Sequence, residues 1–302
     1  MRVGLSGASG FIATTLAREL TDRGDDVVRF VRPESPATTA PSIRWDPARG
    51  VLDEGDARRV GLLDAVVNLA GAGIGDRRWN DARRALLLSS RLDATNLIVE
   101  SLEVLGASTL INGSAIGYYG SRGDEILDET SAAGEDFLAR LCVDWEAAAE
   151  RAPAPVRVSH LRTGIVLDAG GGALARQLPL FRLGLGGRLG HGRQWLSPIS
   201  LADEVSAILW ILDHDLRGPV NLTAPAPLTN ADFTRVLAAA LKRPALLAVP
   251  RAALALALGS GLTDGALLAS QRVLPTRLLE SGFTFRAPDA PSIIRAALAR
   301  TN

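Results

Sequence analysis

Residues 2–13, RVGLSGASGFIA, pass from a strand pattern to a helix pattern across a turn that holds two glycines. The first residues form a short, mostly apolar run, and from Phe11 apolar side chains recur at helical spacing until Gly24. Residues 26–32 make a second apolar run, which Pro33 stops. A strand, a glycine turn, a helix and a strand form a βαβ unit, and such units build parallel sheets.

The glycine turn fits the pattern of a dinucleotide site in two registers, Gly4/Gly7/Gly10 and Gly7/Gly10/Ala13. We favour the second, because Gly4 lies inside the apolar run. In that register Gly7 makes the tight turn, Gly10 lets backbone amides approach a pyrophosphate, and Ala13 lets the helix pack closely on the strand. The amides at the start of the helix then face an anion. A plain tight turn is the alternative, and the surrounding strand–helix–strand order favours the dinucleotide site.

The alternation of strand and helix patterns continues along the chain. Strands are expected at 42–45, 63–69, 109–112 and 156–166, and helices at 80–105 and 137–151. Eight glycines between residues 170 and 192 predict a loop-rich stretch, followed by a helix at 202–212, a strand at 219–222 and a helix ending at residue 241. We therefore predict an α/β protein with a Rossmann-type, doubly wound parallel sheet in residues 1–167. A helix and a strand near 200–224 return to this sheet, and residues 168–302 form a smaller, substrate-facing lobe.

The end of the second strand indicates which dinucleotide is bound. A site for NAD has an acidic residue there, which holds the ribose 2′-hydroxyl. Here the strand ends in Arg32, and the first acid, Glu34, follows Pro33. A guanidinium suits a 2′-phosphate, so we predict NADP(H) as the cofactor. The alternative is that Arg32 is only a solvated surface charge.

Composition and charge narrow the range of partners. The chain has 302 residues, 47% of them hydrophobic, with 33 basic and 33 acidic side chains. This balance gives no reason to expect nucleic acid or a membrane as a partner. One cysteine, Cys142, and three scattered histidines predict neither a disulfide nor a metal site. No signal peptide or apolar span is evident, so we expect a cytoplasmic monomer or homodimer that acts on a small molecule.

Several motifs resemble those of the extended short-chain dehydrogenase/reductases. They are SGASGFI at 6–12, NLAG at 68–71 and SAIGYYG at 114–120. Later stretches resemble an atypical group of that superfamily, the nucleoside-diphosphate-sugar epimerase-like proteins: RTGIVL at 162–167, GLGG at 184–187, GRQW at 192–195, NLTAP at 221–225 and SQRVLP at 270–275. The likeness spans nearly the whole chain. Where such relatives typically read Trp-Ile-His after Trp195, this chain has Pro198, Ile199 and Ser200, so the role of that histidine is in doubt here.

The resemblance implies a set of cofactor contacts. They are Gly7, Ser9, Gly10, Phe11 and Ile12 along the pyrophosphate, Arg32 at the 2′-phosphate, Leu69, Ala70 and Gly71 along the adenine ribose, and Gly113, Ser114, Arg162, Thr163 and Gly164 toward the nicotinamide.

The catalytic pair of that superfamily is absent. Its members use a tyrosine and a lysine four residues later, and the lysine helps to lower the pKa of the tyrosine. In this chain Leu138 and Cys142 take those places, and Lys242, the one lysine, is remote in sequence. We expect Ser114 and one of two tyrosines, Tyr118 or Tyr119, to polarise a substrate carbonyl, which favours reduction. These side chains can instead be packed turn residues, and without a nearby cation neither tyrosine is a good base at pH 7.

Four residues in the glycine-rich stretch are candidates for substrate contact: His191, Arg193, Gln194 and Trp195. They can equally form a surface loop. The leading hypothesis is an NADP(H)-dependent oxidoreductase or epimerase-like enzyme acting on a carbonyl or hydroxyl compound. A protein that senses NADPH without turnover is the alternative, and an assembly factor on a reused scaffold is a weaker third.

Overall fold

The computed structural model describes residues 1–36 and 38–299. Its centre is an eight-stranded sheet in which β4 runs antiparallel to β3 and every other neighbouring pair is parallel. The strands lie in the order β13 (Gly218–Leu222), β8 (Arg157–Thr163), β6 (Thr109–Ala115), β5 (Ala65–Asn68), β1 (Arg2–Ser6), β2 (Asp26–Val31), β3 (Ser42–Asp46) and β4 (Val51–Leu52). The predicted α/β fold class with a Rossmann-type sheet is confirmed.

The strand order reverses direction between β1 and β5. From β1 the chain first builds β2 and β3 on one side, and later β5, β6, β8 and β13 on the other. The helices that follow the two central strands therefore leave on opposite faces, which opens a crevice at their carboxyl ends. Ligands of open α/β sheets bind at such a switch point.

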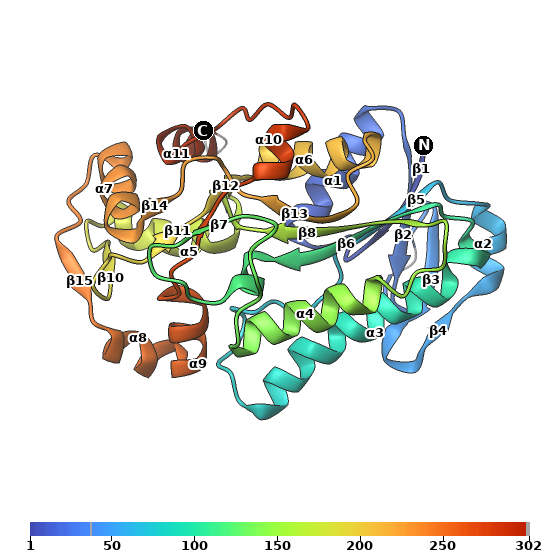
Figure 1. Ribbon diagram of the computed structural model, residues 1–302, viewed down its shortest axis with the longest axis horizontal. Helices are drawn as coiled ribbons and strands as arrows, with labels where there is room; N and C mark the ends of the chain where they lie inside the picture. The colour runs from blue at the N-terminus through green and yellow to red at the C-terminus, as the bar shows by residue number, and fades with distance from the viewer. Residues whose placement is uncertain (37, 300–302) are drawn as a thin grey trace.

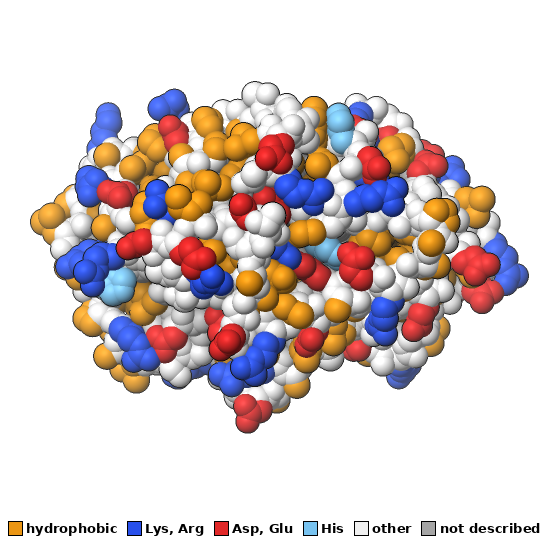
Figure 2. Space-filling view, viewed as in Figure 1, with side chains coloured by type: hydrophobic (Ala, Val, Ile, Leu, Met, Phe, Trp, Pro, Cys, Tyr) orange, Lys and Arg blue, Asp and Glu red, His pale blue; other side chains and the backbone are white. Residues whose placement is uncertain are grey.

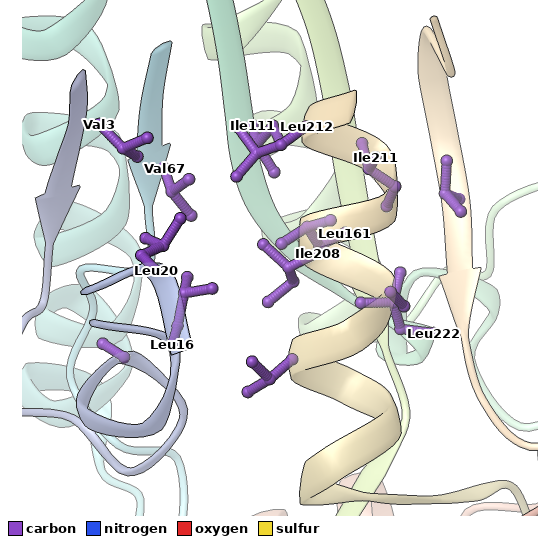
Figure 3. Close-up of a cluster of buried hydrophobic side chains, with 14 of the residues drawn as sticks. Val3, Leu16, Leu20, Val67, Ile111, Leu161, Ile208, Ile211, Leu212 and Leu222 are labelled. Carbon is purple, nitrogen blue, oxygen red and sulfur yellow. The ribbon is translucent and has the colours of Figure 1, made fainter. Parts of the chain in front are cut away.

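Helices cover both faces of the sheet (Figure 1). One face carries α1 (Phe11–Asp22) and α6 (Leu201–Asp213), and the other carries α2 (Glu54–Val60), α3 (Asp81–Leu105) and α4 (Phe137–Ala149). Figure 3 shows Leu16 and Leu20 of α1 on one side of the apolar core, and Ile208 and Ile211 of α6 on the other. The helix and strand that return to the sheet, α6 and β13, fall where the sequence predicted them. How the chain divides into two folding units stays a prediction.

Helix α3 has the predicted boundaries. The Asn80 side chain accepts a hydrogen bond from the amide of Arg83 at 2.8 Å, and Gly106 ends the helix with a φ of +70°. With 25 residues, α3 is about 37 Å long. It begins beyond the carboxyl edge of the sheet, so its first turns stand above that edge.

Residues after 164 form a further apolar cluster, to which α5, α7 and α11 contribute. Besides α6, the helices of this part of the chain are α5 (Gly172–Arg182), α7 (Asn230–Leu241), α8 (Arg251–Leu258), α9 (Ser260–Leu262), α10 (Thr276–Glu280) and α11 (Ala290–Ala299). Short strands β7 (Ile126–Leu127), β9 (Ile165–Asp168), β10 (Gly187–Leu189), β11 (Trp195–Leu196), β12 (Pro198–Ser200), β14 (Leu228–Thr229), β15 (Leu247–Val249) and β16 (Arg272–Val273) form four two-stranded pairs. Short helical turns are η1 (Pro47–Arg49), η2 (Ile116–Tyr119) and the π-turn η3 (Thr263–Leu267).

Two predicted elements were wrong. The stretch 170–192 contains α5, because its glycines gather at 170–172 and 184–192 and leave the residues between them free to form a helix. The predicted strand at 156–166 is broken at Gly164 into β8 and β9. A Cβ at Gly164 would lie 2.4 Å from the carbonyl oxygen of Ser197, so the strand pattern is interrupted where the backbone between β11 and β12 approaches closely.

Acidic and basic side chains are interspersed over the face shown in Figure 2, as expected from their equal numbers in the sequence. Among the helices of the described residues, none combines the length and the apolar character that crossing a bilayer requires.

Candidate functional site at the carboxyl edge of the sheet

The glycine turn joins β1 to α1 at the switch point. Gly7 has a φ of +63°, and a Cβ there would lie 2.6 Å from the carbonyl oxygen of Leu69, so only glycine fits. Gly10 precedes α1, and no side chain caps this helix start, while Ser9 and Gly10 are exposed. The first amides of a helix have no partner within it, so these amides are available to an anion.

The structure distinguishes the two glycine registers. Ala13 is 1% exposed on the inner side of α1, as the favoured register requires. Gly4 serves packing instead, because a Cβ there would lie 2.8 Å from Leu63 and 2.9 Å from the ring of Phe30. The ring of Phe11 also lies close to the backbone of Gly171, because a Cβ at Gly171 would lie 2.5 Å from this ring. The side chain of Phe11 thus packs toward α5 and leaves its backbone facing the turn.

Arg32 follows β2 directly, on the same edge of the sheet. Its side chain is 70% exposed, and its nearest carboxylate, that of Glu34, lies 4.0 Å away and is equally open to solvent. Such a long, solvated pair is weak. The guanidinium is therefore free to bind a phosphate that lies over the end of β2.

A network of buried polar side chains lies beneath the carboxyl edge of the sheet. Ser6 donates to the Asn68 side-chain oxygen at 2.6 Å and accepts the amides of Leu69 and Ala70 at 3.1 and 3.2 Å. The Asn68 amide nitrogen in turn donates to Asn112 at 2.7 Å and to Thr95 at 3.0 Å. These bonds link β1, β5, β6 and α3 and fix the loop at 69–71, where the sequence predicted contacts to the adenine ribose.

A second buried network joins β6, β8 and α4. The hydroxyl of Ser114 donates to the carboxylate of Glu146 at 2.6 Å, and Arg162 forms two bonds with the same carboxylate, each 2.9 Å long. The side chains of Arg162 and Glu146 are 4% and 11% exposed. A bidentate arginine–carboxylate pair is strong and directional. It holds the Glu146 carboxylate in place and so fixes the orientation of Ser114 at the end of β6.

Arg162 also contacts both tyrosines. Its guanidinium carbon lies 3.4 Å from the ring centroid of Tyr118, and it donates to the hydroxyl of Tyr119 at 3.0 Å. The expectation that neither tyrosine has a nearby cation was wrong, because an arginine of β8, remote in sequence, supplies one. Tyr119 is fully buried and donates to Asn221 at 2.7 Å, and burial raises its pKa to about 12. Tyr118 is half-buried.

Helix α4 presents Leu138 and Cys142 where a tyrosine and a lysine stand in the related enzymes. Both are buried, at 8% and 2% exposure, and they pack near Gly117. Burial raises the pKa of the Cys142 thiol to about 12, so it stays neutral at physiological pH. Glu146 follows one turn later on the same face of the helix.

The remaining residues predicted to approach the nicotinamide differ in their burial and in their contacts. Gly113 is buried under the ring of Trp145, which a Cβ there would meet at 2.8 Å, so its small size serves packing and it is not open to a ligand. Thr163 is half-buried and donates to Glu204 at 2.8 Å. Glu204 is fully buried, and burial raises its pKa to about 8. The neighbouring Asp203 instead accepts the amides of residues 286 and 287 and braces the chain.

The four predicted substrate residues do not converge. His191 and Arg193 are exposed on one turn, where the Arg193 amide donates to the His191 ring at 2.9 Å. Gln194 is 1% exposed and donates to the carbonyl of Leu189 at 3.1 Å. Trp195 donates to Asp124 at 2.8 Å, and so lies against the loop that follows η2. Ser200, in the place of the relatives' histidine, caps α6 by accepting the amide of Asp203 at 3.0 Å.

No cluster of metal-ligating side chains occurs within residues 1–36 and 38–299.

Comparison with known proteins shows the family of this chain. Residues 3–222 match the model of the NAD dependent epimerase/dehydratase family, and residues 249–297 match a domain of unknown function, DUF1731. Epimerase family protein MT2273 of Mycobacterium tuberculosis is 44% identical over 285 residues, which cover 94% of this chain and 93% of that protein. The chain belongs to the NAD dependent epimerase/dehydratase family.

Within this family, two solved structures are particularly similar. Human epimerase family protein SDR39U1, solved with NADPH, has a TM-score of 0.89 and 32% identity and covers 99% of both chains. The nucleoside-diphosphate sugar epimerase of Corynebacterium glutamicum has a TM-score of 0.78 and 32% identity, and the match covers 99% of this chain and 58% of that one. The resemblance to epimerase-like proteins is thus confirmed, and the NADPH of the human relative agrees with the cofactor predicted here.

The sequence analysis did not single out two residues of this region, Glu146 and Glu204. Glu146 lies eight residues after Leu138 and four after Cys142, on the face of α4 that meets Ser114. That spacing was a usable signal. For Glu204, at the start of α6, no local pattern reveals the contact with Thr163.

Proposed function

We propose that this chain binds NADP(H) and catalyses a reduction or oxidation between the carbonyl and hydroxyl forms of a small molecule. The observation that carries the proposal is the turn at Gly7 and Gly10, where no larger residue than glycine fits at the first position and an uncapped helix start faces the crevice. Arg32, with its guanidinium open at the adjacent strand end, supports the phosphorylated cofactor. The NADPH of human SDR39U1 supports the same choice.

These residues fit the cofactor by shape and charge. The Gly10 amide donates to the carbonyl of Gly7 at 2.7 Å, so the amides of Phe11 and Ile12 would hold the pyrophosphate. Arg32 would hold the 2′-phosphate, and Leu69, Ala70 and Gly71 would border the adenine ribose. The bound cofactor would supply a hydride to a carbonyl carbon, or accept one from an alcohol. Thr163 and Gly164, at the end of β8, would flank the reacting half of the site.

The protein's own contribution is to orient the substrate oxygen and to supply its proton. Ser114 donates its one proton to Glu146, so its oxygen would accept a hydrogen bond from the hydroxyl form of the substrate and orient it. Tyr118 would donate the proton that turns the developing alkoxide into an alcohol, and the guanidinium against its ring would stabilise the resulting phenolate. Tyr119 is the poorer donor, because it is fully buried and its hydroxyl already serves Asn221 and Arg162.

Stopped-flow loss of NADPH fluorescence over a panel of aldehydes and ketones tests this proposal. Ser114→Ala and Tyr118→Phe should each slow turnover by about 10²-fold while leaving the Kd for NADPH nearly unchanged. Tyr119→Phe is the matched comparison and should act mainly on stability. Unchanged rates in both Ser114→Ala and Tyr118→Phe would remove these residues from the mechanism.

An NADPH sensor without turnover is the second candidate. The observation that favours it is the buried, neutral pair of Leu138 and Cys142 in place of the tyrosine and lysine. A sensor should bind NADPH with calorimetric heat and show no oxidation of it with any member of the carbonyl panel.

A further inference from the structure

Arg91 is a largely buried cation beside the loop that follows β5. It lies on α3, and its Nη1 donates to the carbonyl oxygens of Ala72 at 3.1 Å and Leu87 at 2.9 Å. Within the described residues no carboxylate forms an ion pair with it. A largely desolvated cation without an acidic partner is costly, which calls for a compensating role.

The position of Arg91 relative to the carboxyl edge of the sheet can be worked out from Thr95, one turn later on α3. Thr95 accepts a hydrogen bond from Asn68, the last residue of β5, so it lies level with the carboxyl edge. Arg91 is one helical turn, about 6 Å, closer to the start of α3 and therefore above that edge. Trp145 of α4 also donates to Thr95, at 3.0 Å, and Cys142 is about one turn above Trp145. Arg91 and Cys142 thus stand at similar heights on two facing helices.

Direct contacts agree with this position. The guanidinium carbon lies 5.0 Å from the centroid of the Trp145 ring, and a Cβ at Gly71 would lie 3.1 Å from it. The charge of Arg91 also acts to lower the pKa of the Cys142 thiol, against the larger effect of burial, as expected for two side chains that lie near each other. The cation is therefore bounded by the loop after β5 and by the place on α4 where the related enzymes carry a lysine.

We propose that Arg91 supplies the positive charge beside the nicotinamide ribose, which in short-chain dehydrogenases comes from the lysine of the catalytic pair. The inference rests on the proposed binding of NADP(H). A cation at this place holds the ribose hydroxyls and stabilises the charge of a nearby phenolate. It also repels the oxidised nicotinamide ring, which is positively charged, and so favours NADPH over NADP⁺. A residue that only anchors the 71–73 loop would lack this last effect.

The test compares the Kd of NADP⁺ with that of NADPH, by calorimetry, in the wild type, Arg91→Gln and Arg91→Lys. Loss of the charge in Arg91→Gln should lower the ratio Kd(NADP⁺)/Kd(NADPH) about tenfold, and Arg91→Lys should keep it near the wild-type value. Adenosine 2′,5′-bisphosphate, which lacks the nicotinamide half, should bind all three proteins equally. Arg84→Gln, an exposed change on the same helix, is the matched control and should leave the ratio unchanged.

A measurement on the wild type covers the case in which Arg91→Gln does not fold. Phenylglyoxal modification, mapped by mass spectrometry, should be blocked at Arg91 by NADPH and not by the bisphosphate. An unchanged ratio in Arg91→Gln, an Arg91→Lys that behaves like Arg91→Gln, or modification of Arg91 that NADPH does not affect would each overturn the inference. A wild type that binds neither NADPH nor the bisphosphate would instead refute the proposed function.

Discussion

Gly7 and Gly50 have nearly the same backbone conformation and very different surroundings. Their φ angles are +63° and +64°. An added Cβ at Gly7 would lie 2.6 Å from the Leu69 carbonyl oxygen, whereas no atom lies within 4 Å of one at Gly50. Replacing each glycine by alanine therefore separates the cost of the left-handed conformation from the cost of the steric clash.

The two costs have different magnitudes. A left-handed conformation costs a non-glycine residue about 1–2 kcal/mol, and this is the whole penalty expected for Gly50→Ala. Gly7→Ala carries the same penalty and also forces apart the backbones of the glycine turn and the loop after β5, which adds about 1–3 kcal/mol. We expect Gly7→Ala to lose about 2–5 kcal/mol of unfolding free energy.

Urea unfolding measures the stability difference, and NADPH titration measures its functional counterpart. Gly50→Ala should keep the wild-type Kd for NADPH, because an added Cβ there meets no atom within 4 Å and the turn after η1 need not move. Gly7→Ala should weaken NADPH binding by at least tenfold, since the turn must move where the pyrophosphate is expected. Equal destabilisation of the two variants, or wild-type NADPH affinity in Gly7→Ala, would refute the reasoning.

Three further predictions concern buried ionisable groups. Glu146→Gln leaves the buried Arg162 guanidinium without its counter-charge and should lower the free energy of unfolding in urea by about 3 kcal/mol; a loss below about 1 kcal/mol would contradict this. The pKa of Glu204 in the folded protein is raised to about 8. Between about pH 4.5 and 8, the free energy of unfolding of the wild type should therefore fall by about 1.4 kcal/mol per pH unit relative to that of Glu204→Gln. A difference in unfolding free energy between the two proteins that does not change with pH would argue against this prediction. The Cys142 thiol, with a pKa raised to about 12, should resist iodoacetamide at pH 8 in the native protein and react in urea, as mass spectrometry can show; rapid native alkylation is the contrary result.

The sign of the Glu204 prediction follows from proton binding. Between about pH 4.5 and 8 the folded protein keeps the proton on this carboxyl and the unfolded chain releases it. The unfolded state is therefore favoured as pH rises through this window. Glu204→Gln has no such proton to release.

The sheet and its dinucleotide turn could be predicted because their signals are local. Gly7, Gly10 and Ala13 stand between a strand and a helix within one short stretch, and Asn80 and Gly106 mark the ends of α3. The prediction of a loop at 170–192 failed because glycines were counted over the whole stretch rather than located at its ends.

The centre of the site was harder to predict, because its side chains come from strands and helices remote in sequence. Arg162 of β8 reaches Glu146 of α4 and Tyr118 of η2, and only the fold brings the three together. The absence of a lysine near the tyrosines therefore did not mean the absence of a cation. Gln194 illustrates the reverse case, since a polar residue in a glycine-rich stretch is buried and bonded to its own loop.

Calorimetric titration of the wild type and Arg32→Ala with NADPH and NADH tests the central claim most directly. We expect the wild type to bind NADPH at least tenfold more tightly than NADH, and Arg32→Ala to lose that preference while it still binds both. Absence of heat with NADPH at millimolar concentration, or an undiminished preference in Arg32→Ala, would contradict the claim.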